Sequence, residues 1–214
     1  MANVILITGA SRVLGRALAE QLHDQQLALV ARHPFEGPAG SLVLTADVGL
    51  EAERIVQETL RRFGRIDILI NNASTLGATP MPELQNADWR DVAQVVHTNV
   101  LAPLHLAQLS RARIVVNISS DAGVEAYPGW GVYGLSKAAL EHQTRTLAAE
   151  NPERIFVAVD PGDMNTQMHR EAVPDADLEQ LQDPKVVAAR LAGWLLHAPQ
   201  SGRIRVSELV ESAR

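Results

Sequence analysis

The chain alternates short runs of Val, Ile and Leu with longer stretches in which apolar residues recur every three or four positions. Continuous apolar runs are typical of strands buried on both faces, and the longer period is typical of helices that cover them. The alternation therefore predicts an α/β fold, a doubly wound parallel sheet between two layers of helices. Seven strands are expected, over Val4–Thr8, Leu27–Ala31, Leu42–Ala46, Ile66–Ile70, Arg113–Ser119, Ile155–Val159 and Arg203–Val206. Helices are expected over Leu14–His23, Leu50–Phe63, Ala87–Ser110, Val132–Glu150 and Pro184–His197.

No change in composition and no low-complexity linker divides the 214 residues, so residues 1–214 are expected to form a single domain. One connection departs from the pattern. Between the second and third strands, the residues HPFEGPAGS contain two Pro and two Gly, which a stable helix does not tolerate. The helix between these two strands is therefore predicted to be missing. A second irregular and polar segment, Asp163–Asp183, is typical of a mobile lid beyond the end of the sheet.

Composition excludes several classes of function. The net charge is −6, from 19 basic and 25 acidic residues, so the chain has no excess positive field to bind nucleic acid. The absence of cysteine excludes disulfides and thiolate metal sites and fits a cytoplasmic location. No His pair has the spacing of metal ligands, so no metal site is predicted. The apolar run at the start is short and no long one follows, so neither a secretion signal nor a membrane span is expected.

A glycine-bearing turn, TGASRVLG at residues 8–15, lies between the first strand and the first helix. Backbone N–H groups and the positive end of a helix meet at such a turn, which predicts a pyrophosphate site. The residues expected to bind the cofactor there are Gly9, Ser11, Arg12, Leu14 and Gly15. The third strand ends at Asp47 and Val48, where a carboxylate can accept the adenine amino group or simply begin the next helix.

The end of the second strand indicates which cofactor is preferred. An acidic residue there would accept hydrogen bonds from the ribose of NAD, but this chain has Ala31 and Arg32. Arg12 in the glycine turn is a second cation. Because two guanidinium groups can bind a 2′-phosphate in bidentate fashion, NADP(H) is expected to be preferred, with NAD(H) as the other option. The alternative interpretation is that Arg32 is a solvated strand end.

Tyr133 and Lys137 lie four residues apart on a predicted helix and therefore on one face of it. A phenol has a reference pKa of about 10, so Lys137 is expected to lower that pKa and let Tyr133 exchange a proton near neutrality. Ser120 ends the strand before this helix, where its hydroxyl can hold a carbonyl oxygen or only form a turn. Asn99 lies within a long apolar helix, which its amide either distorts or uses to anchor a water chain to Lys137.

Apolar and aromatic residues near these groups are candidates for a substrate pocket. Tyr127 and Trp130, between Ser120 and Tyr133, either line a pocket or pack within the loop. Met168 in the Asp163–Asp183 segment offers a further apolar contact, so a small or medium, largely apolar carbonyl compound is expected as substrate. Trp89 and Trp194 lie on predicted amphipathic helices and are expected in the core.

Taken together and in this order, the motifs resemble the short-chain dehydrogenase/reductase family, whose members are NAD(P)-dependent oxidoreductases on a Rossmann fold. The resemblance covers nearly the whole chain, from the glycine turn through the Asn71-Asn72-Ala73-Ser74 run to Pro161-Gly162. It implies that Tyr133 is the general acid/base and that Ser120 orients the substrate oxygen. It also implies that Lys137 lowers the phenol pKa and binds the nicotinamide ribose, and that Asn99 positions a relay water.

The same resemblance implies further cofactor contacts and an assembly. Asn72 and Ala73 would lie beside the adenosine or ribose. Contacts to the nicotinamide amide are implied for Pro161, Gly162, Met164 and Thr166. A homodimer or homotetramer is implied, formed through the helices over 87–110 and 132–150.

The chain departs from the family pattern at four points. Val13 replaces the middle glycine of the turn and Ser74 replaces the usual glycine of its run. The helix between the second and third strands is missing, and the chain is shorter than most relatives. The expected function is hydride transfer between NADP(H) and a carbonyl or alcohol substrate. Because of Val13 and the shortened cleft, a catalytically weak regulatory or scaffold protein that binds nucleotide stays open, as does an isomerase or dehydratase that uses the same tyrosine.

Overall fold

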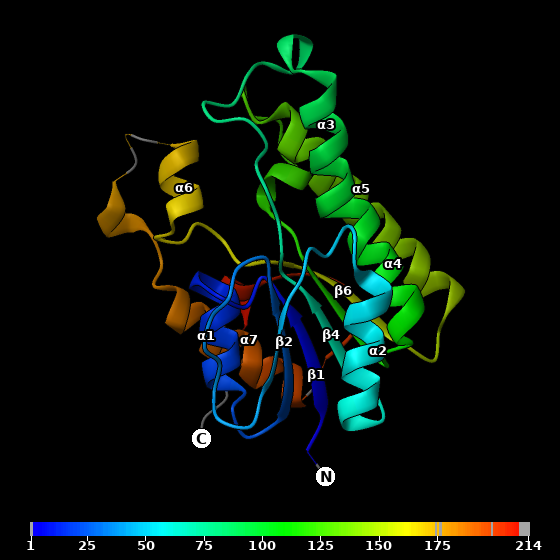
Figure 1. Ribbon diagram of the computed structural model, residues 1–214. Helices are drawn as coiled ribbons and strands as arrows, with labels where there is room; N and C mark the ends of the chain where they lie inside the picture. The colour runs from blue at the N-terminus through cyan, green and yellow to red at the C-terminus, as the bar shows by residue number, and fades with distance from the viewer. Residues whose placement is uncertain (1, 174, 176, 198, 210–214) are drawn as a thin grey trace.

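One sheet of parallel strands occupies the centre of the computed structural model (Figure 1). The structure describes residues 2–173, 175, 177–197 and 199–209, and within these ranges the sheet has seven strands. They are β1 (Val4–Thr8), β2 (Gln26–Ala31), β3 (Leu42–Thr45), β4 (Ile68–Asn71), β5 (Ile114–Ile118), β6 (Ile155–Asp160) and β7 (Gly202–Arg205). Their order is β3-β2-β1-β4-β5-β6-β7, and all neighbours are parallel. The predicted doubly wound, seven-stranded Rossmann-type sheet is therefore confirmed.

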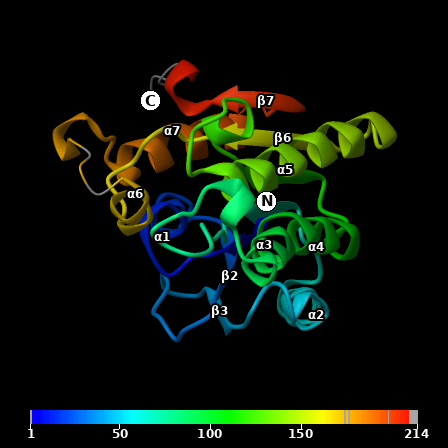
Figure 2. The same cartoon turned by 90° about the horizontal axis from the view of Figure 1, so that it is seen from above.

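Helices cover both faces of this sheet, as the view from above shows (Figure 2). On one face α1 (Val13–Gln21) packs against α7 (Pro184–His197). On the other face α2 (Ala52–Phe63) packs against α4 (Ala102–Ser110). The long helix α5 (Gly131–Glu150) packs along β6 and against α3 (Trp89–Val96). The short helix α6 (Gln167–Ala172) lies beyond the end of the sheet.

The side chains of β1 show why a continuous apolar run forms a central strand. Ile5 and Ile7 join the cluster beneath α1 and α7, whereas Leu6 joins the cluster beneath α2 and α4. All three side chains are fully shielded from solvent. Burying each of them stabilises the fold by about 1.5–3 kcal/mol, so both layers of helices are attached through the same strand.

The connection between β2 and β3 contains no helix, as predicted. The loop takes the place of the missing helix by packing directly on the sheet. Phe35 packs against the core cluster of α1 and α7, and a Cβ atom at Gly37 would lie 2.7 Å from the Cδ1 atom of Leu29. A larger residue at this position would require the Leu29 side chain to shift.

The prediction of one helix over Ala87–Ser110 is wrong in detail. The structure has α3, then a π-helical turn at His97–Leu101, then α4. Pro103 explains the break, because it has no N–H to bond the carbonyl of Asn99 four residues earlier. The N–H of Ala102 instead donates to the carbonyl of His97, five residues back.

The Asp163–Asp183 segment is also more regular than expected. Helix α6 begins after Thr166, whose hydroxyl accepts a hydrogen bond of 3.0 Å from the N–H of His169. Met164 pairs with Gln182 in an isolated parallel bridge, so the two ends of the segment lie side by side. A helix of six residues is too short to show a clear apolar period, which is why the sequence did not predict it.

Candidate active site

The predicted site residues gather at the carboxyl edge of the sheet. The strand order changes direction between β1 and β4, and ligands of open parallel sheets bind in the crevice at such a point. The glycine turn follows β1, the run from Asn71 to Ser74 follows β4, and Ser120 follows β5. Tyr133 and Lys137 lie in the first half of α5, which starts at this same edge.

The turn after β1 is tied to the loop after β4. The side-chain amide of Asn72 donates to the carbonyls of Thr8 (3.0 Å) and Gly9 (3.1 Å), and the Thr8 hydroxyl accepts from the backbone N–H groups of Asn72 and Ala73, both at 3.0 Å. A Cβ atom on Gly9 or Gly15 would lie 2.8 or 2.6 Å from the Asn72 amide nitrogen. Asn72 therefore shapes the turn, and both positions need glycine.

The start of α1 fits a pyrophosphate. No side chain caps its first turn, and no acidic residue lies in that turn. Its amides and positive helix end are thus directed at the position where a diphosphate binds in folds of this kind. Val13 has φ +49°, a left-handed conformation that costs an L-residue about 1–2 kcal/mol and suits a β-branched side chain poorly. The site fits the group, with strain at Val13.

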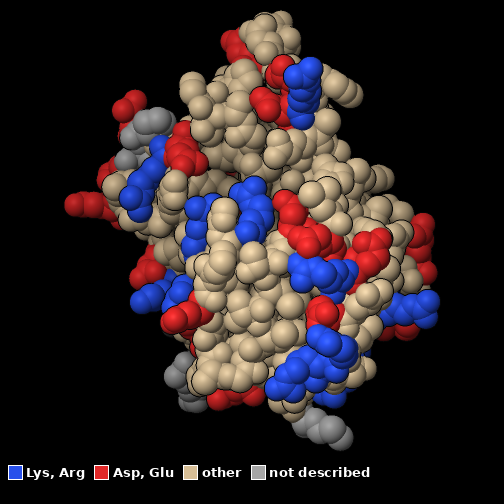
Figure 3. Space-filling view, in the orientation of Figure 1, with Lys and Arg blue, Asp and Glu red and all other residues tan. Residues whose placement is uncertain are grey.

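Basic side chains lie near this turn. Figure 3 shows Lys and Arg side chains grouped near the upper end of the sheet, beside an acidic group. Arg12 and Arg32 are both exposed, at the glycine turn and just after β2. Arg12 donates a hydrogen bond of 3.3 Å to Gln167 in α6, so the turn and α6 are in contact. Neither guanidinium is paired with a carboxylate among the described residues, which leaves both available to an anion.

Asp47 lies where the chain passes from β3 to α2. Its Oδ1 atom accepts a hydrogen bond of 2.8 Å from the N–H of Gly49, and its own N–H donates to Glu51 at 2.8 Å. The structure thus shows the helix-start role for this carboxylate, and an adenine contact stays a prediction. Val48 beside it is buried.

Lys137 is 2% exposed, and its Nζ atom donates a hydrogen bond of 2.8 Å to the carbonyl of Ile118. The same nitrogen lies 5.2 Å from the ring centroid of Tyr133. Burial lowers the pKa of Lys137 to about 7, and the negative charge of Glu141 opposes this change. Near neutrality this lysine is therefore only partly protonated.

The structure shows no lowering of the Tyr133 pKa by Lys137, and that role of Lys137 stays a prediction. Burial, which disfavours the phenolate, raises the pKa of Tyr133, and the charges of Asp121 and Asp160 raise it further. The Ser74 and Ser120 hydroxyls act in the opposite direction. The cause is geometric, because the Lys137 ammonium is directed at the Ile118 carbonyl and stands beside the phenol ring.

Ser120 is held by its neighbour in the chain. Its hydroxyl donates to Oδ1 of Asp121 at 2.9 Å and accepts from the N–H of Ala122 at 3.2 Å. The other oxygen of Asp121 accepts a hydrogen bond of 2.9 Å from the Tyr127 hydroxyl. Tyr127 therefore packs within the loop, which was one of its two expected roles.

Trp130 connects this loop to the phenol. Its ring makes edge contacts with Tyr127, at 6.5 Å between centroids, and with Tyr133, at 5.8 Å. The indole thus helps to fix the orientation of the Tyr133 ring. A role for Trp130 and Tyr127 in binding substrate stays a prediction.

Asn99 is buried in the π-helical turn and joins three elements. Its Oδ1 atom accepts from the N–H of Thr75 at 2.9 Å, and its amide donates to the Thr75 carbonyl (2.9 Å) and the Ser136 hydroxyl (3.0 Å). The helix distortion expected at Asn99 is present, and its amide fixes the loop after β4 against α5. The relay-water role stays a prediction.

A buried ionic network, which the sequence did not indicate as part of the site, lies behind the catalytic candidates. Arg203 of β7 donates to Glu141 (3.0 Å), to Asp160 (3.0 Å) and to the Ser120 carbonyl (3.4 Å). Glu141 also accepts a hydrogen bond of 2.7 Å from the Ser119 hydroxyl. In the sequence, only the position of Glu141 indicated a link between this network and the site. Glu141 follows Lys137 by four residues and so lies on the same face of α5.

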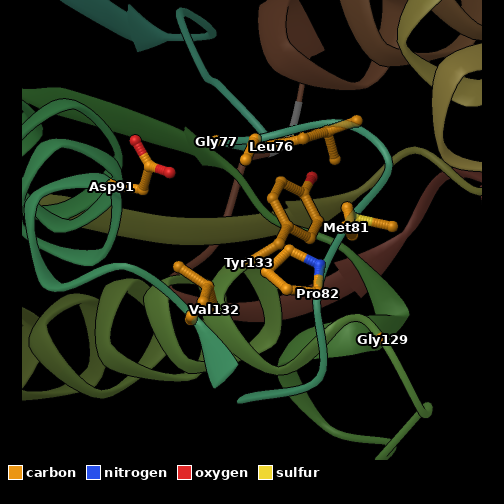
Figure 4. A pocket seen from close by; sticks show the side chains of 10 residues that line it. Leu76, Gly77, Met81, Pro82, Asp91, Gly129, Val132 and Tyr133 are labelled. Carbon is orange, nitrogen blue, oxygen red and sulfur yellow. The ribbon is translucent and has the colours of Figure 1, made fainter. Parts of the chain in front are cut away.

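A small, mostly apolar cavity opens beside the Tyr133 ring (Figure 4). Its walls come from the loop after β4, from the start of α3 and from α5: Leu76, Gly77, Ala78, Met81, Pro82, Ala87, Asp91, Gly129, Val132 and Tyr133. Met168 and Trp130 pack against the adjoining cluster of Leu76, Ala122 and Tyr133. The cavity has a volume of about 10 Å³, room for about one water molecule, and a role in binding substrate stays a prediction.

The residues expected near the nicotinamide follow β6. Pro161 is buried, and Gly162 has φ +73° and donates its N–H to Asp160 at 3.0 Å. Met164 packs against the core cluster of α1 and α7, and Thr166 begins α6. They line the same edge of the sheet as the glycine turn, and their contacts with a cofactor stay predictions.

Comparison with known proteins identifies the family. The sequence profile described as short chain dehydrogenase matches residues 3–177. This chain belongs to the short chain dehydrogenase family. It is similar to the uncharacterized oxidoreductase YciK of Escherichia coli K12. The two are 31% identical over an alignment of 219 residues that covers 91% of this chain and 86% of YciK.

Two further relatives extend the comparison. The benzil reductase ((S)-benzoin forming) of Saccharomyces cerevisiae is 29% identical over 239 residues, covering 92% of this chain and 91% of that protein. The crystal structure of the KRED1-Pglu enzyme superposes with a TM-score of 0.85 at 26% identity, covering 95% of this chain and 100% of that one. This short chain dehydrogenase is thus an oxidoreductase of a family that uses nicotinamide cofactors on small molecules. Within the described ranges, none of its helices combines the length and apolar character needed to cross a membrane.

Proposed function

We propose that this short chain dehydrogenase is an NADP(H)-dependent oxidoreductase that transfers a hydride between nicotinamide and a carbonyl or alcohol substrate, with Tyr133 as general acid/base. The observation that carries the proposal is the position of Tyr133. Its side chain lines the apolar cavity, and its ring centroid lies 5.2 Å from Nζ of Lys137, at the sheet edge where the glycine turn also lies. A proton donor and a nucleotide site thus meet at one crevice.

When bound, the nicotinamide cofactor supplies the hydride that the substrate carbon gains or loses. The amides at the start of α1, with Gly9 and Gly15, would hold its pyrophosphate. Arg12 and Arg32 would bind a 2′-phosphate, which favours NADP(H), with NAD(H) as the weaker ligand. The remaining contacts are proposed for Ser11, Leu14, Asp47, Val48, Asn72, Ala73, Pro161, Gly162, Met164 and Thr166.

The raised pKa of Tyr133 has a direct chemical consequence. A phenol with a high pKa stays protonated near neutrality, so Tyr133 is ready to donate a proton to a carbonyl oxygen that is being reduced. The phenolate left behind needs stabilisation. The hydroxyl groups near it and the protonated fraction of Lys137 supply this, since the pKa of Lys137 is about 7.

The proposed substrate is a small or medium carbonyl compound with an apolar body. The cavity beside Tyr133 is lined mainly by apolar side chains such as Leu76, Met81 and Val132. A yeast relative bears the name benzil reductase, so benzil is a suitable member of a test panel. Following NADPH absorbance across a panel of ketones, aldehydes and diketones tests this. Consumption of NADPH that requires a carbonyl compound supports the proposal, whereas conversion without NADPH would favour an isomerase or dehydratase.

A regulatory or scaffold protein that binds nucleotide is the second candidate, because Val13 is strained in the turn. Fluorescence titrations with NADPH and NADH separate the two functions. Tight binding of NADPH together with turnover supports the enzyme. Tight binding without turnover of any carbonyl compound in the panel supports the regulatory or scaffold protein. Absence of binding at millimolar nucleotide would contradict both proposed functions.

We also propose that the protein is a homodimer or homotetramer. Leu101 in the π-helical turn and Leu135 on α5 are large apolar residues with about half of their surface exposed. An interface on α4 and α5 would cover them. Light scattering after size-exclusion chromatography tests this, and Leu135→Glu should lower the mass to that of one chain.

A further inference from the structure

The proton of the Ser120 hydroxyl is already committed. It is donated to Oδ1 of Asp121, at 2.9 Å, and a carboxylate can only accept. Asp121 is itself held by the Tyr127 hydroxyl (2.9 Å) and by the N–H of Ala122 (2.8 Å). These bonds keep the pKa of Asp121 low, although burial opposes them, so the carboxylate stays charged. The Ser120 hydroxyl therefore already shares its proton with Asp121.

Ser74 has the opposite character. Its Oγ atom is shielded from solvent and has no hydrogen-bond partner of normal geometry among the described residues. A buried hydroxyl without a partner is costly and rare, which points to a partner supplied during function. Leu76, two residues further along the same loop, packs in one cluster with Tyr133, and the Ser74 hydroxyl favours the ionised form of the phenol.

The loop that carries Ser74 is firmly fixed. The residue before it, Ala73, donates its N–H to the Thr8 hydroxyl, and the residue after it, Thr75, is bonded at both its N–H and its carbonyl by Asn99. A side chain on a loop held at both sides keeps its direction at little entropic cost. The backbone position of Ser74 is thus fixed on both sides.

We propose that Ser74 is a catalytic residue: its hydroxyl, which has no other partner in the described part of the chain, donates the hydrogen bond that stabilises the oxygen of Tyr133 during proton transfer, whereas the Ser120 hydroxyl is shared with Asp121. This inference rests on the proposed function of Tyr133 as general acid. It gives Ser74 a role toward the phenol oxygen, which is separate from the orientation of the substrate oxygen that the family resemblance implies for Ser120.

During reduction, the Oη–H bond of Tyr133 breaks. Its proton bonds to the substrate oxygen, and the electron pair stays on Oη. The carbonyl carbon gains the hydride that the cofactor supplies, and the phenolate later takes a proton from water. Ser74 stabilises Oη while it carries the negative charge, because a neutral donor bonds an anion more strongly than a neutral oxygen.

Steady-state kinetics with NADPH and a carbonyl compound that the wild type reduces test this role. Ser74→Ala should lower kcat by at least tenfold and leave the KM for NADPH within twofold, since loss of one preorganised donor typically costs about 10²–10³ in kcat. Thr75→Val is the matched control. It removes a hydroxyl from the next residue, whose contacts with Asn99 are all through the backbone, and kcat should stay within twofold.

Ser74→Thr keeps the hydroxyl and should recover part of the lost rate, which a purely structural role would not explain. A kcat within twofold of wild type for Ser74→Ala would overturn the proposal. If instead Tyr133→Phe still reduces the carbonyl compound, the general-acid role itself has failed, and that outcome is distinct from a failure of Ser74.

A second measurement needs neither cofactor nor substrate. The chain has only two tyrosines, so protein labelled with ¹³C at tyrosine Cζ gives two resonances, which Tyr127→Phe assigns. Ser74→Ala should move the Tyr133 resonance and its pH dependence, whereas Thr75→Val should leave both unchanged. A Tyr133 resonance that is identical in wild type and Ser74→Ala would show that the two groups do not interact, and would overturn the proposal whatever the enzyme catalyses.

Discussion

Arg203→Ala should destabilise the protein more than any other single arginine change in this network. The guanidinium of Arg203 lies 3.0 Å from Oε1 of Glu141 and 3.0 Å from Oδ2 of Asp160. The two carboxylate side chains are only 4% and 5% exposed, so without Arg203 two negative charges stay buried. Removing one partner of a buried ion pair costs about 3–5 kcal/mol, a large share of a typical stability of about 5–15 kcal/mol.

The neighbouring arginine on the same strand is a matched control. Arg205 lies 3.7 Å from the same carboxylate oxygen of Asp160, but its side chain is 48% exposed. An exposed pair of this kind contributes about 0–1 kcal/mol, so Arg205→Ala should have little effect. Arg203→Lys should recover only part of the stability, because an ammonium cannot reproduce the planar fork that reaches both carboxylates.

Urea unfolding followed by circular dichroism measures the free energies directly. For a chain of this size, about 1 kcal/mol corresponds to roughly 2–4 °C in Tm, so Arg203→Ala should lower Tm by about 6–20 °C. A decrease in the free energy of unfolding below about 1 kcal/mol, or equal decreases for the Arg203 and Arg205 variants, would refute the reasoning. It would show that burial of these carboxylates does not determine how much stability is lost.

Three further predictions concern the site itself. Tyr133→Phe should abolish turnover while the Kd for NADPH stays within a few-fold, and residual turnover near the wild-type rate would refute its role. Val13→Gly should strengthen NADPH binding in fluorescence titrations, because φ +49° suits glycine; an unchanged Kd would show that the strain is irrelevant. Burial lowers the pKa of Lys137 from its ordinary value of 10.5 to about 7, so between these values the unfolded chain binds more protons and stability should rise with pH. Urea titrations from pH 7 toward pH 10 should show that rise, and it should be weaker in Lys137→Met.

The features that local sequence determines were predicted well. Strands such as β1 are continuous apolar runs, and two Pro and two Gly between β2 and β3 exclude a helix there, so periodicity and residue type were sufficient for these features. Pro103 in the sequence indicates an interruption of the helix, but the apolar period on either side of it favoured one continuous helix. Trp194 packs against the core, as expected, whereas Trp89 is 78% exposed, because the first turn of α3 extends beyond the sheet that would cover it.

Features that depend on which atoms meet in space were not predicted. The pKa of Tyr133 depends on burial and on the direction of the Lys137 ammonium, and spacing along α5 gives neither. Arg203 of β7 is 62 residues from Glu141 of α5 and 43 residues from Asp160 of β6, so spacing along the chain does not indicate that the three side chains meet. The commitment of the Ser120 proton to Asp121 likewise depends on a rotamer rather than on residue type.

A crystal structure of the protein with bound NADP⁺ tests the central claim most directly. We expect the pyrophosphate on the amides at the start of α1, Arg12 and Arg32 at the 2′-phosphate, and the nicotinamide beside the phenol oxygen of Tyr133. A cofactor bound elsewhere, or a nicotinamide ring on the far side of the sheet edge from Tyr133, would contradict it.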